Sequence, residues 1–261
     1  MDTGLHISLA AERVGTFLGL PITNTLIAAW VVIAVLVLVG LLVRRNLSLV
    51  PGKLQNAFEM LIEYVFNMME QTFGSRVLAA RYFPFIATIF IFILASNLFD
   101  FLPIFGTFGF YHGEEFIPFF HPVNADLNTT LALAIISFFV IEVSGILTLG
   151  VLKYGSKFVN LKAGAMMFVV GLLELIGNLA RLISFSFRLF GAIFAGEVLL
   201  MVVGTFVPYF LPVPLMAFEA FIGLLQAGIF AILTMAFIKI AVEEPHVEHK
   251  VASNKFQVSN K

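Results

Sequence analysis

The chain has 261 residues, a formal net charge of −1, 60% hydrophobic and 12% charged residues, and no cysteine. Soluble domains are about one quarter charged and about half apolar. The composition therefore excludes a soluble enzyme and a disordered segment, and the lack of a basic surplus excludes a nucleic-acid-binding protein. We predict an all-α membrane protein that crosses the lipid bilayer several times, with residues 1–261 as one integral membrane domain.

The first apolar run follows a segment, residues 1–25, of mixed composition that has no basic region typical of a signal peptide. Residues 26–43 are sufficient in number to cross a bilayer, and they end at Arg44 and Arg45. This pattern predicts a first membrane span and not a cleaved signal peptide.

Residues 53–81 have a different pattern. Glutamates and arginines alternate there with apolar side chains. The apolar side chains recur at helical spacing, at Phe58, Leu61, Ile62, Val65, Met68 and Met69. An amphipathic helix at the membrane interface shows this pattern, and the alternative is a hairpin on the aqueous side.

The rest of the chain contains four more hydrophobic segments. They are span 2 at 83–105, span 3 at 127–152, a long segment at 163–207 and a last helix at 215–242, before a polar tail at 243–261. The long segment has no proline, and one helix of that length would measure about 65 Å, twice the ~30 Å hydrocarbon core. It is either one steeply tilted helix or a hairpin without a turn signal. We predict five membrane-embedded helices plus the interfacial one.

The distribution of lysine and arginine predicts the orientation. If the spans alternate, most basic residues fall on one side: Arg44, Arg45, Lys53, Arg76, Arg81, Lys153, Lys157, Lys162, Lys239, Lys250, Lys255 and Lys261. The opposite loops, 106–126 and 206–214, contain neither lysine nor arginine. Because cytoplasmic loops carry the basic excess, we expect the N-terminus outside and the C-terminal tail in the cytoplasm.

Seven ionisable residues fall within or beside the hydrophobic segments: Asp100, Glu142, Glu174, Arg181, Arg188, Glu197 and Glu219. Each charged group at the membrane centre costs roughly 2.5–3.5 kcal/mol on insertion scales, so such residues are candidates for function. For any one of them taken alone, a paired or snorkelling side chain is the structural alternative.

The spacing of these residues places several of them on common helix faces. Glu174, Arg181 and Arg188 are seven residues apart, which is about two turns, and Ser184 and Gly191 fall on the same stripe. Small residues near Arg188 allow another helix to approach closely: Ala192, Ala195 and Gly196.

Carboxylates occupy other faces. Glu197 follows Arg188 by nine residues and points to the opposite side of the helix, while Glu219 and Gln226 share a face of the last helix. A guanidinium does not deprotonate in proteins, whereas a desolvated carboxylate can take and release protons. The pattern therefore indicates proton passage around an arginine barrier, with a second proton carrier on another chain.

Residues 184–197, SFSFRLFGAIFAGE, strongly resemble the hallmark segment of subunit a of the F-type ATP synthase. The resemblance continues in NLFDFLP at 97–103, in ADLNTTL at 125–131 and in the last helix from Leu225 to Thr234. It covers the chain from about Leu54 to Val242.

The resemblance implies two long, steeply tilted helices against a rotating ring of c subunits, with Arg188 opposite the ring carboxylates, where it blocks a proton short circuit. It implies close ring packing at Gly191, Ala195 and Gly196. It also implies two aqueous half-channels. The outer one would contain Asn97, Asp100, Glu197, Glu219 and Gln226, and the cytoplasmic one would border Glu174, Arg181 and Ser184.

Two positions depart from the family pattern or lie outside it. The family often has Asn where this chain has Ala192, so Ala192 is left out of the site. Glu142 belongs to no family motif, and we expect it in the outer half-channel only because it faces the membrane interior from span 3.

The resemblance further implies a bacterial inner-membrane subunit that couples a proton gradient to ring rotation and ATP synthesis without being an enzyme by itself. The implied partners are the c-subunit ring, the peripheral-stalk b subunits and the remaining F1Fo subunits, with no nucleic acid, cofactor or metal. The alternatives are a stand-alone transporter and an intramembrane hydrolase. Against them, the chain has no internal repeat and no zinc-hydrolase or serine-nucleophile motif.

Overall fold

The computed structural model describes residues 11–17, 19–45, 52–101, 109–112, 115–158, 165–207 and 210–243. Predictions for residues 1–10 and for the tail from residue 244 lie outside this part of the chain. The helices are α1 Asn24–Arg45, α2 Lys53–Phe73, α3 Arg76–Phe99, α4 Leu127–Leu149, α5 Val151–Phe158, α6 Ala165–Phe206 and α7 Pro212–Val242, with a 3-10 turn η1 Val123–Ala125. The strands form two antiparallel hairpins, β1 Arg13–Phe17 with β2 Leu20–Thr23 and β3 Gly109–His112 with β4 Glu115–Pro118.

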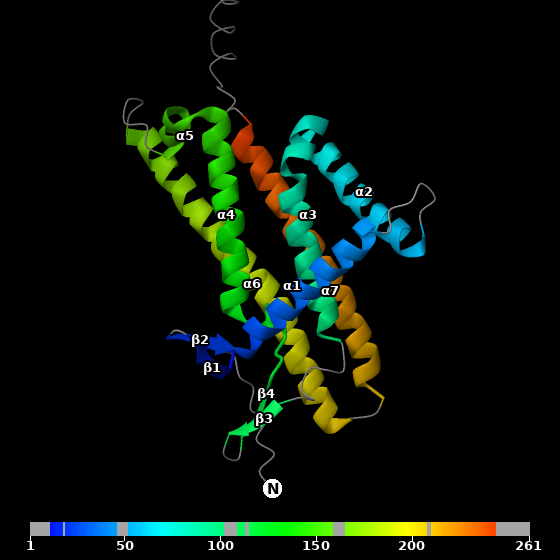
Figure 1. Cartoon of the computed structure of the whole chain (residues 1–261). Coiled ribbons are helices and arrows are strands. Elements are labelled where there is room, and N and C mark those ends of the chain that lie inside the picture. The colour runs from blue at the N-terminus through cyan, green and yellow to red at the C-terminus, as the bar shows by residue number, and fades with distance from the viewer. Residues whose placement is uncertain are drawn as a thin grey trace, which may run out of the picture.

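The body of the molecule is a bundle of long helices, which α1 crosses obliquely (Figure 1). Five described helices, α1, α3, α4, α6 and α7, are long and apolar enough to cross a membrane. This confirms the predicted all-α membrane fold with five spans. Helices α6 and α7 run antiparallel along the length of the molecule and are joined by a short connection (Figure 1).

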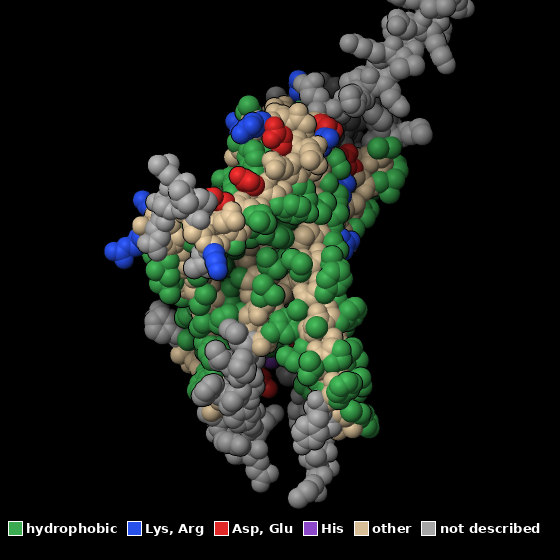
Figure 2. All heavy atoms as spheres, turned by 90° about the vertical axis from the view of Figure 1, so that its right-hand side faces the viewer, with side chains coloured by type: hydrophobic (Ala, Val, Ile, Leu, Met, Phe, Trp, Pro, Cys, Tyr) green, Lys and Arg blue, Asp and Glu red, His purple; other side chains and the backbone are tan. Residues whose placement is uncertain are grey.

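The two ends of the bundle differ in charge. Helices α2 and α5 lie at one end, which we call the basic end, and both strand hairpins lie at the other, the hairpin end (Figure 1). Figure 2 shows lysine and arginine side chains gathered toward the basic end, above a flank of hydrophobic side chains. Two described basic residues lie elsewhere: Arg13 in β1, at the hairpin end, and Arg188, near the middle of α6.

The amphipathic segment is shorter than predicted. Helix α2 ends at Phe73 because Gly74 adopts a left-handed conformation with φ of 64°, and Ser75 then caps α3 by accepting a hydrogen bond from the backbone N–H of Leu78. The predicted extension to residue 81 was therefore wrong, and span 2 begins at Arg76 and not at residue 83.

Span 3 also ends earlier than predicted. Helix α4 stops at Leu149, because Gly150 has a φ of 81°, and the chain turns into the short helix α5 instead of continuing to residue 152. The predicted last helix begins three residues earlier than expected, at Pro212, where a proline at the first helical turn is tolerated.

The segment after α5 is one uninterrupted helix. Helix α6 runs for 42 residues from Ala165 to Phe206, which corresponds to about 63 Å at ~1.5 Å per residue. This excludes the alternative of a hairpin within residues 163–207.

The core forms where α2, α3, α4, α6 and α7 meet. Its largest fully buried apolar side chains are Met69, Ile86, Ile93, Leu189 and Met235. Because lipid is as apolar as these side chains, close packing and small residues hold membrane helices together more than exclusion of water does. At Gly223 of α7 an added Cβ would lie 2.8 Å from Cβ of Asn97, so only glycine permits α3 and α7 to approach this closely.

Candidate functional site

Arg188 lies on the exposed side of α6, opposite the core. Its neighbours Phe185 and Leu189 are buried in the bundle, while Arg188 itself is exposed. Its guanidinium Nη2 donates to Oγ of Ser184 over 3.4 Å, and no carboxylate of the described residues lies within ion-pair distance of it. A permanent positive charge in so apolar a helix requires a counter-ion, which this part of the chain does not supply.

The backbone at Arg188 is fixed by α7. The side-chain amide of Gln226, which is buried, donates a hydrogen bond to the backbone carbonyl of Arg188. The polar side chain on α7 thus holds α6 at the residue that carries the charge, and the Arg188 side chain remains available to the outside.

The surface beside Arg188 is smooth. An added Cβ on Gly191 would meet nothing within 4 Å, and Ala195 is exposed. We call the surface formed by Ser184, Arg188, Gly191 and Ala195 the Arg188 face. At Gly196 an added Cβ would lie 2.7 Å from Oε1 of Glu219. The small size of Gly196 therefore makes room for that side chain, and its packing against a ring stays a prediction.

Four ionisable residues lie together toward the hairpin end. We call Asp100, His121, Glu197 and Glu219 the hairpin-end cluster. Nε2 of His121 lies 3.7 Å from Oε1 of Glu197, and Glu219 of α7 packs against Gly196, the residue before Glu197. Burial raises the pKa of Asp100 well above its usual range, and the nearby carboxylates of Glu197 and Glu219 raise it further.

The cluster is rich in carboxyl oxygens without partners. One oxygen each of Asp100, Glu197 and Glu219 is buried and accepts no hydrogen bond from the described residues. Buried polar atoms are nearly always paired, and carboxyls this close do not all ionise at once. The arrangement is therefore suited to holding protons and passing them between groups.

Asn97 links this cluster to the helix packing. Its Oδ1 accepts from Nδ2 of Asn124 at 2.7 Å, and its Nδ2 donates to the carbonyl of Gly223 at 2.9 Å. Both asparagines are buried, so the contacts fix the end of α3 against α7 and the segment before α4.

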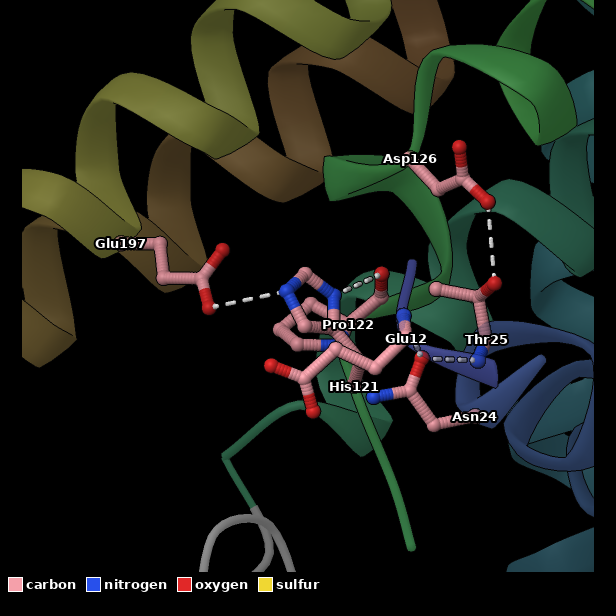
Figure 3. A network of polar contacts seen from close by, with 7 residues as sticks. All are labelled: Glu12, Asn24, Thr25, His121, Pro122, Asp126 and Glu197. Carbon is pink, nitrogen blue, oxygen red and sulfur yellow. Dashed lines mark hydrogen bonds and ion pairs between the residues drawn. The ribbon is translucent and has the colours of Figure 1, made fainter. Parts of the chain in front are cut away.

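A second polar network anchors the segment before α4 to α1 (Figure 3). Asp126 caps α4 by accepting from the backbone N–H of Asn128 at 2.9 Å, and its other oxygen accepts from Oγ1 of Thr25 at 2.9 Å. Asp126 is buried and fully partnered, unlike the carboxyls of the hairpin-end cluster. It therefore serves to position the segment that carries His121.

Glu142 lies in a separate network with α5 and α6. Oη of Tyr154 donates to its Oε2 at 2.8 Å, and Nδ2 of Asn178 donates to its Oε1 at 3.1 Å. A small cavity beside it is also lined by Arg181, whose guanidinium lies 4.7 Å from the centre of the Phe237 ring. We call Glu142, Tyr154 and Asn178 the α5 latch. Burial, with the Glu142 carboxylate adding to it, raises the pKa of Tyr154, which keeps its donor proton.

The sequence that forms this site matches a known protein family. A family model described as ATP synthase A chain matches residues 26–239. The chain belongs to the ATP synthase A chain family. Among its relatives, ATP synthase subunit a of Geotalea daltonii is 36% identical over 219 residues, which cover 83% of this chain and 86% of that protein.

Other relatives agree. ATP synthase subunit a 2 of Syntrophotalea carbinolica is 36% identical over 248 residues, which cover 93% of this chain and 94% of that protein. ATP synthase subunit a of Moorella thermoacetica is 31% identical over 219 residues, which cover 84% of this chain and 90% of that protein. The family that the hallmark segment indicated is thereby confirmed.

Within this member of the ATP synthase A chain family, the structure sorts the predicted residues into groups. Asn97, Asp100, Glu197 and Glu219 lie at or beside the hairpin-end cluster, as their common assignment expected. Glu142 is not part of this group, since its carboxylate contacts Tyr154 of α5 and Asn178 of α6, and its assignment to the outer half-channel stays a prediction. Glu174 is exposed on α6 and contributes no side-chain hydrogen bond to either group of described residues.

The predicted site does not include three polar residues of the segment before α4, although Asp126 lies within the ADLNTTL segment: His121, Asn124 and Asp126. All three lie within six positions, directly before a hydrophobic span. Asp before a helix is a capping signal, and buried capping would have indicated that the segment enters the bundle. Nothing in the sequence indicates that His121 meets Glu197, because 76 positions separate them.

Proposed function

We propose that this chain is the stator of an ATP synthase proton motor, and that it carries protons to and from a ring of c subunits. The observation that carries the proposal is Arg188. Its charge is exposed on the smooth Arg188 face and has no counter-ion among the described residues. A ring of carboxylates that passes this face would supply that counter-ion, one subunit at a time.

The two ends of the bundle would serve as two separate half-channels. The hairpin-end cluster, with Asn97 and Gln226, would conduct protons from the outside solution to a ring carboxylate. Arg181 and Ser184, with Glu174, would border the path by which protons leave to the cytoplasm. The basic end has the arginine excess expected of the cytoplasmic side, which supports an outside N-terminus and a cytoplasmic C-terminus.

Arg188 would separate the two paths. Since a guanidinium does not give up its proton at accessible pH, protons could not pass along it from one path to the other. They would have to ride on the ring, and each elementary charge that crosses 100 mV releases about 2.3 kcal/mol for rotation. The proton gradient and ring rotation would be coupled because protons could not pass directly from one half-channel to the other.

The length of α6 supports a steep tilt in the membrane. A helix of about 63 Å fits a hydrocarbon core of ~30 Å only if it lies obliquely or extends beyond the core. Such a helix would follow the curved surface of a ring over several ring subunits.

The implied partners are the c ring, the peripheral-stalk b subunits and the remaining subunits of the complex, in a bacterial inner membrane.

The test is substitution of Arg188 in the intact complex. Arg188→Ala should assemble with the ring, because the side chain makes no buried contact in the chain, yet it should abolish ATP-driven proton pumping in proteoliposomes. Arg44→Ala, at the exposed end of α1, is the matched control and should pump normally. Coupled pumping by Arg188→Ala at the wild-type rate would refute the barrier, and purification of this chain without a ring would refute the stator.

A further inference from the structure

His121 is the one described histidine side chain, and it faces a carboxylate inside the bundle (Figure 3). It lies two residues before η1, in the segment that Asp126 anchors to α1. Its Nε2 points to Oε1 of Glu197 across 3.7 Å, and its Nδ1 lies 3.3 Å from the carbonyl oxygen of Pro122. The imidazole is thus held between a backbone carbonyl and a carboxylate of α6.

The contact with Pro122 determines which nitrogen can exchange a proton. A carbonyl oxygen only accepts hydrogen bonds, so Nδ1 keeps its hydrogen whether the ring is neutral or charged. Nε2 and the Glu197 carboxyl then share a single proton. Either Glu197 is a neutral acid facing a neutral imidazole, or the ring is an imidazolium facing a carboxylate.

The pair remains open to solution. The side chain of His121 is 13% exposed and that of Glu197 is 26% exposed, so neither is sealed in the bundle. Figure 2 shows acidic and histidine side chains toward the hairpin end. A distance of 3.7 Å is longer than a hydrogen bond, and a small side-chain rotation or one bridging water would close it.

The surroundings of His121 are acidic. Glu197 faces it from α6, with Glu219 of α7 and Asp100 at the end of α3 beyond Glu197. Glu12, before β1, directs its carboxylate to the same space in Figure 3, and one of its oxygens is buried without a partner among the described residues. Imidazole is the side chain best suited to exchange protons with water near neutral pH.

We propose that His121 passes protons between the outside solution and Glu197, as an additional proton-transfer residue of this chain. In the inward direction, Nε2 of the neutral ring accepts a proton from hydronium in the solution at the hairpin end, and the ring becomes imidazolium. The N–H bond then breaks, an O–H bond forms on Oε1 of Glu197, and the neutral ring is restored. The proposal rests on the proposed function, since it assigns the hairpin end to the outer path.

The experiment compares ATP-driven pumping and gradient-driven ATP synthesis by the purified complex in proteoliposomes. The pH that is varied, called the outer pH, is that of the solution on the side of the hairpin end. His121→Gln, which keeps a donor for Pro122 but cannot be protonated, should slow both rates at least about tenfold, a smaller loss than the roughly 10²–10⁴-fold that a general acid–base group contributes. It should also flatten their dependence on outer pH. The matched control is His112→Ala, nine positions earlier in the same connection, which should keep wild-type rates and profile.

A second variant separates proton transfer from a structural role. His121→Ala should be slow, and imidazole added on the outer side should restore part of its rate, whereas the His112→Ala rate should not change. A slow His121→Ala that imidazole does not restore, or a His121→Gln with the wild-type rate and pH profile, would overturn the proposal. Either result leaves the stator assignment intact if Arg188→Ala still abolishes pumping, so the two failures are distinguishable.

Discussion

The bundle contains two partly buried carboxylate sites that differ in how their oxygens are satisfied. At the α5 latch, both oxygens of Glu142 accept hydrogen bonds, one from Tyr154 and one from Asn178. In the hairpin-end cluster, three carboxyls each leave a buried oxygen without a partner. A carboxylate whose two oxygens both accept hydrogen bonds serves a structural role, because taking up a proton would disrupt one of those hydrogen bonds. A carboxyl without donors can change its protonation at little structural cost.

The largest expected effect contrasts these two sites directly. Glu197→Gln should slow ATP-driven pumping at least about tenfold, because an amide cannot relay a proton, and Glu142→Gln should slow it less than about twofold. Pumping is measured with a pH-sensitive dye in proteoliposomes at equal complex content. Equal rates for the two variants would mean that hydrogen-bond satisfaction does not separate a structural carboxylate from a functional one.

The next effect concerns the stability of the α5 latch. Tyr154→Phe removes one donor from Glu142 and leaves its oxygen unsatisfied, at a cost of about 1–3 kcal/mol. Hydrogen exchange of the complex in detergent should therefore become faster along Val151–Phe158. Tyr64→Phe, where the side chain is 64% exposed on α2, is the control and should leave exchange unchanged. The Tyr154 ring also lies against Gly145 of α4, where an added Cβ would overlap it. Unaltered protection of α5 in Tyr154→Phe would show that this packing is sufficient to hold α5.

The smallest expected effect is a pH dependence of stability. Because the pKa of Asp100 is raised in the folded chain, folding favours its protonated form. This contribution is present at low pH and is lost as the pH rises through the raised pKa. The thermal midpoint of the complex should therefore fall as the pH rises above the ordinary aspartate pKa of about 4, and it should fall less in Asp100→Asn. The control Glu59→Gln, on the exposed side of α2, should retain the wild-type dependence of the thermal midpoint on pH. The same dependence in Asp100→Asn would show that Asp100 is not its source.

Much of the architecture could be predicted because apolar runs of span length have few other interpretations. The five spans and the stripe that contains Arg188 follow from hydropathy and from the 3.6-residue period. The division between α2 and α3 was missed because Gly74 and Ser75 interrupt neither pattern, although together they form a helix stop and a cap. The continuity of α6 could not be decided, since the absence of a turn signal is compatible with a helix and with a hairpin.

The site was less predictable than the fold. Helical spacing tells which residues share a face, but it does not tell which residue of another helix lies opposite. The partner of Glu142 could not be predicted because the return of α5 over α4, which brings Tyr154 to it, depends on the left-handed Gly150. The contact of His121 with Glu197 arises from a non-helical segment whose path is fixed by Asp126, and no periodicity reports such a path.

The bond from Gln226 to the backbone of Arg188 has a mechanical consequence. Glu219 and Gln226 lie seven residues apart on α7, about 10.5 Å along the helix at ~1.5 Å per residue. Because the side chain of Gln226 donates to the main-chain carbonyl of Arg188, a sideways force on Arg188 would be transmitted to α7 as well as to α6. The lateral load would then be shared with the helix that carries Glu219.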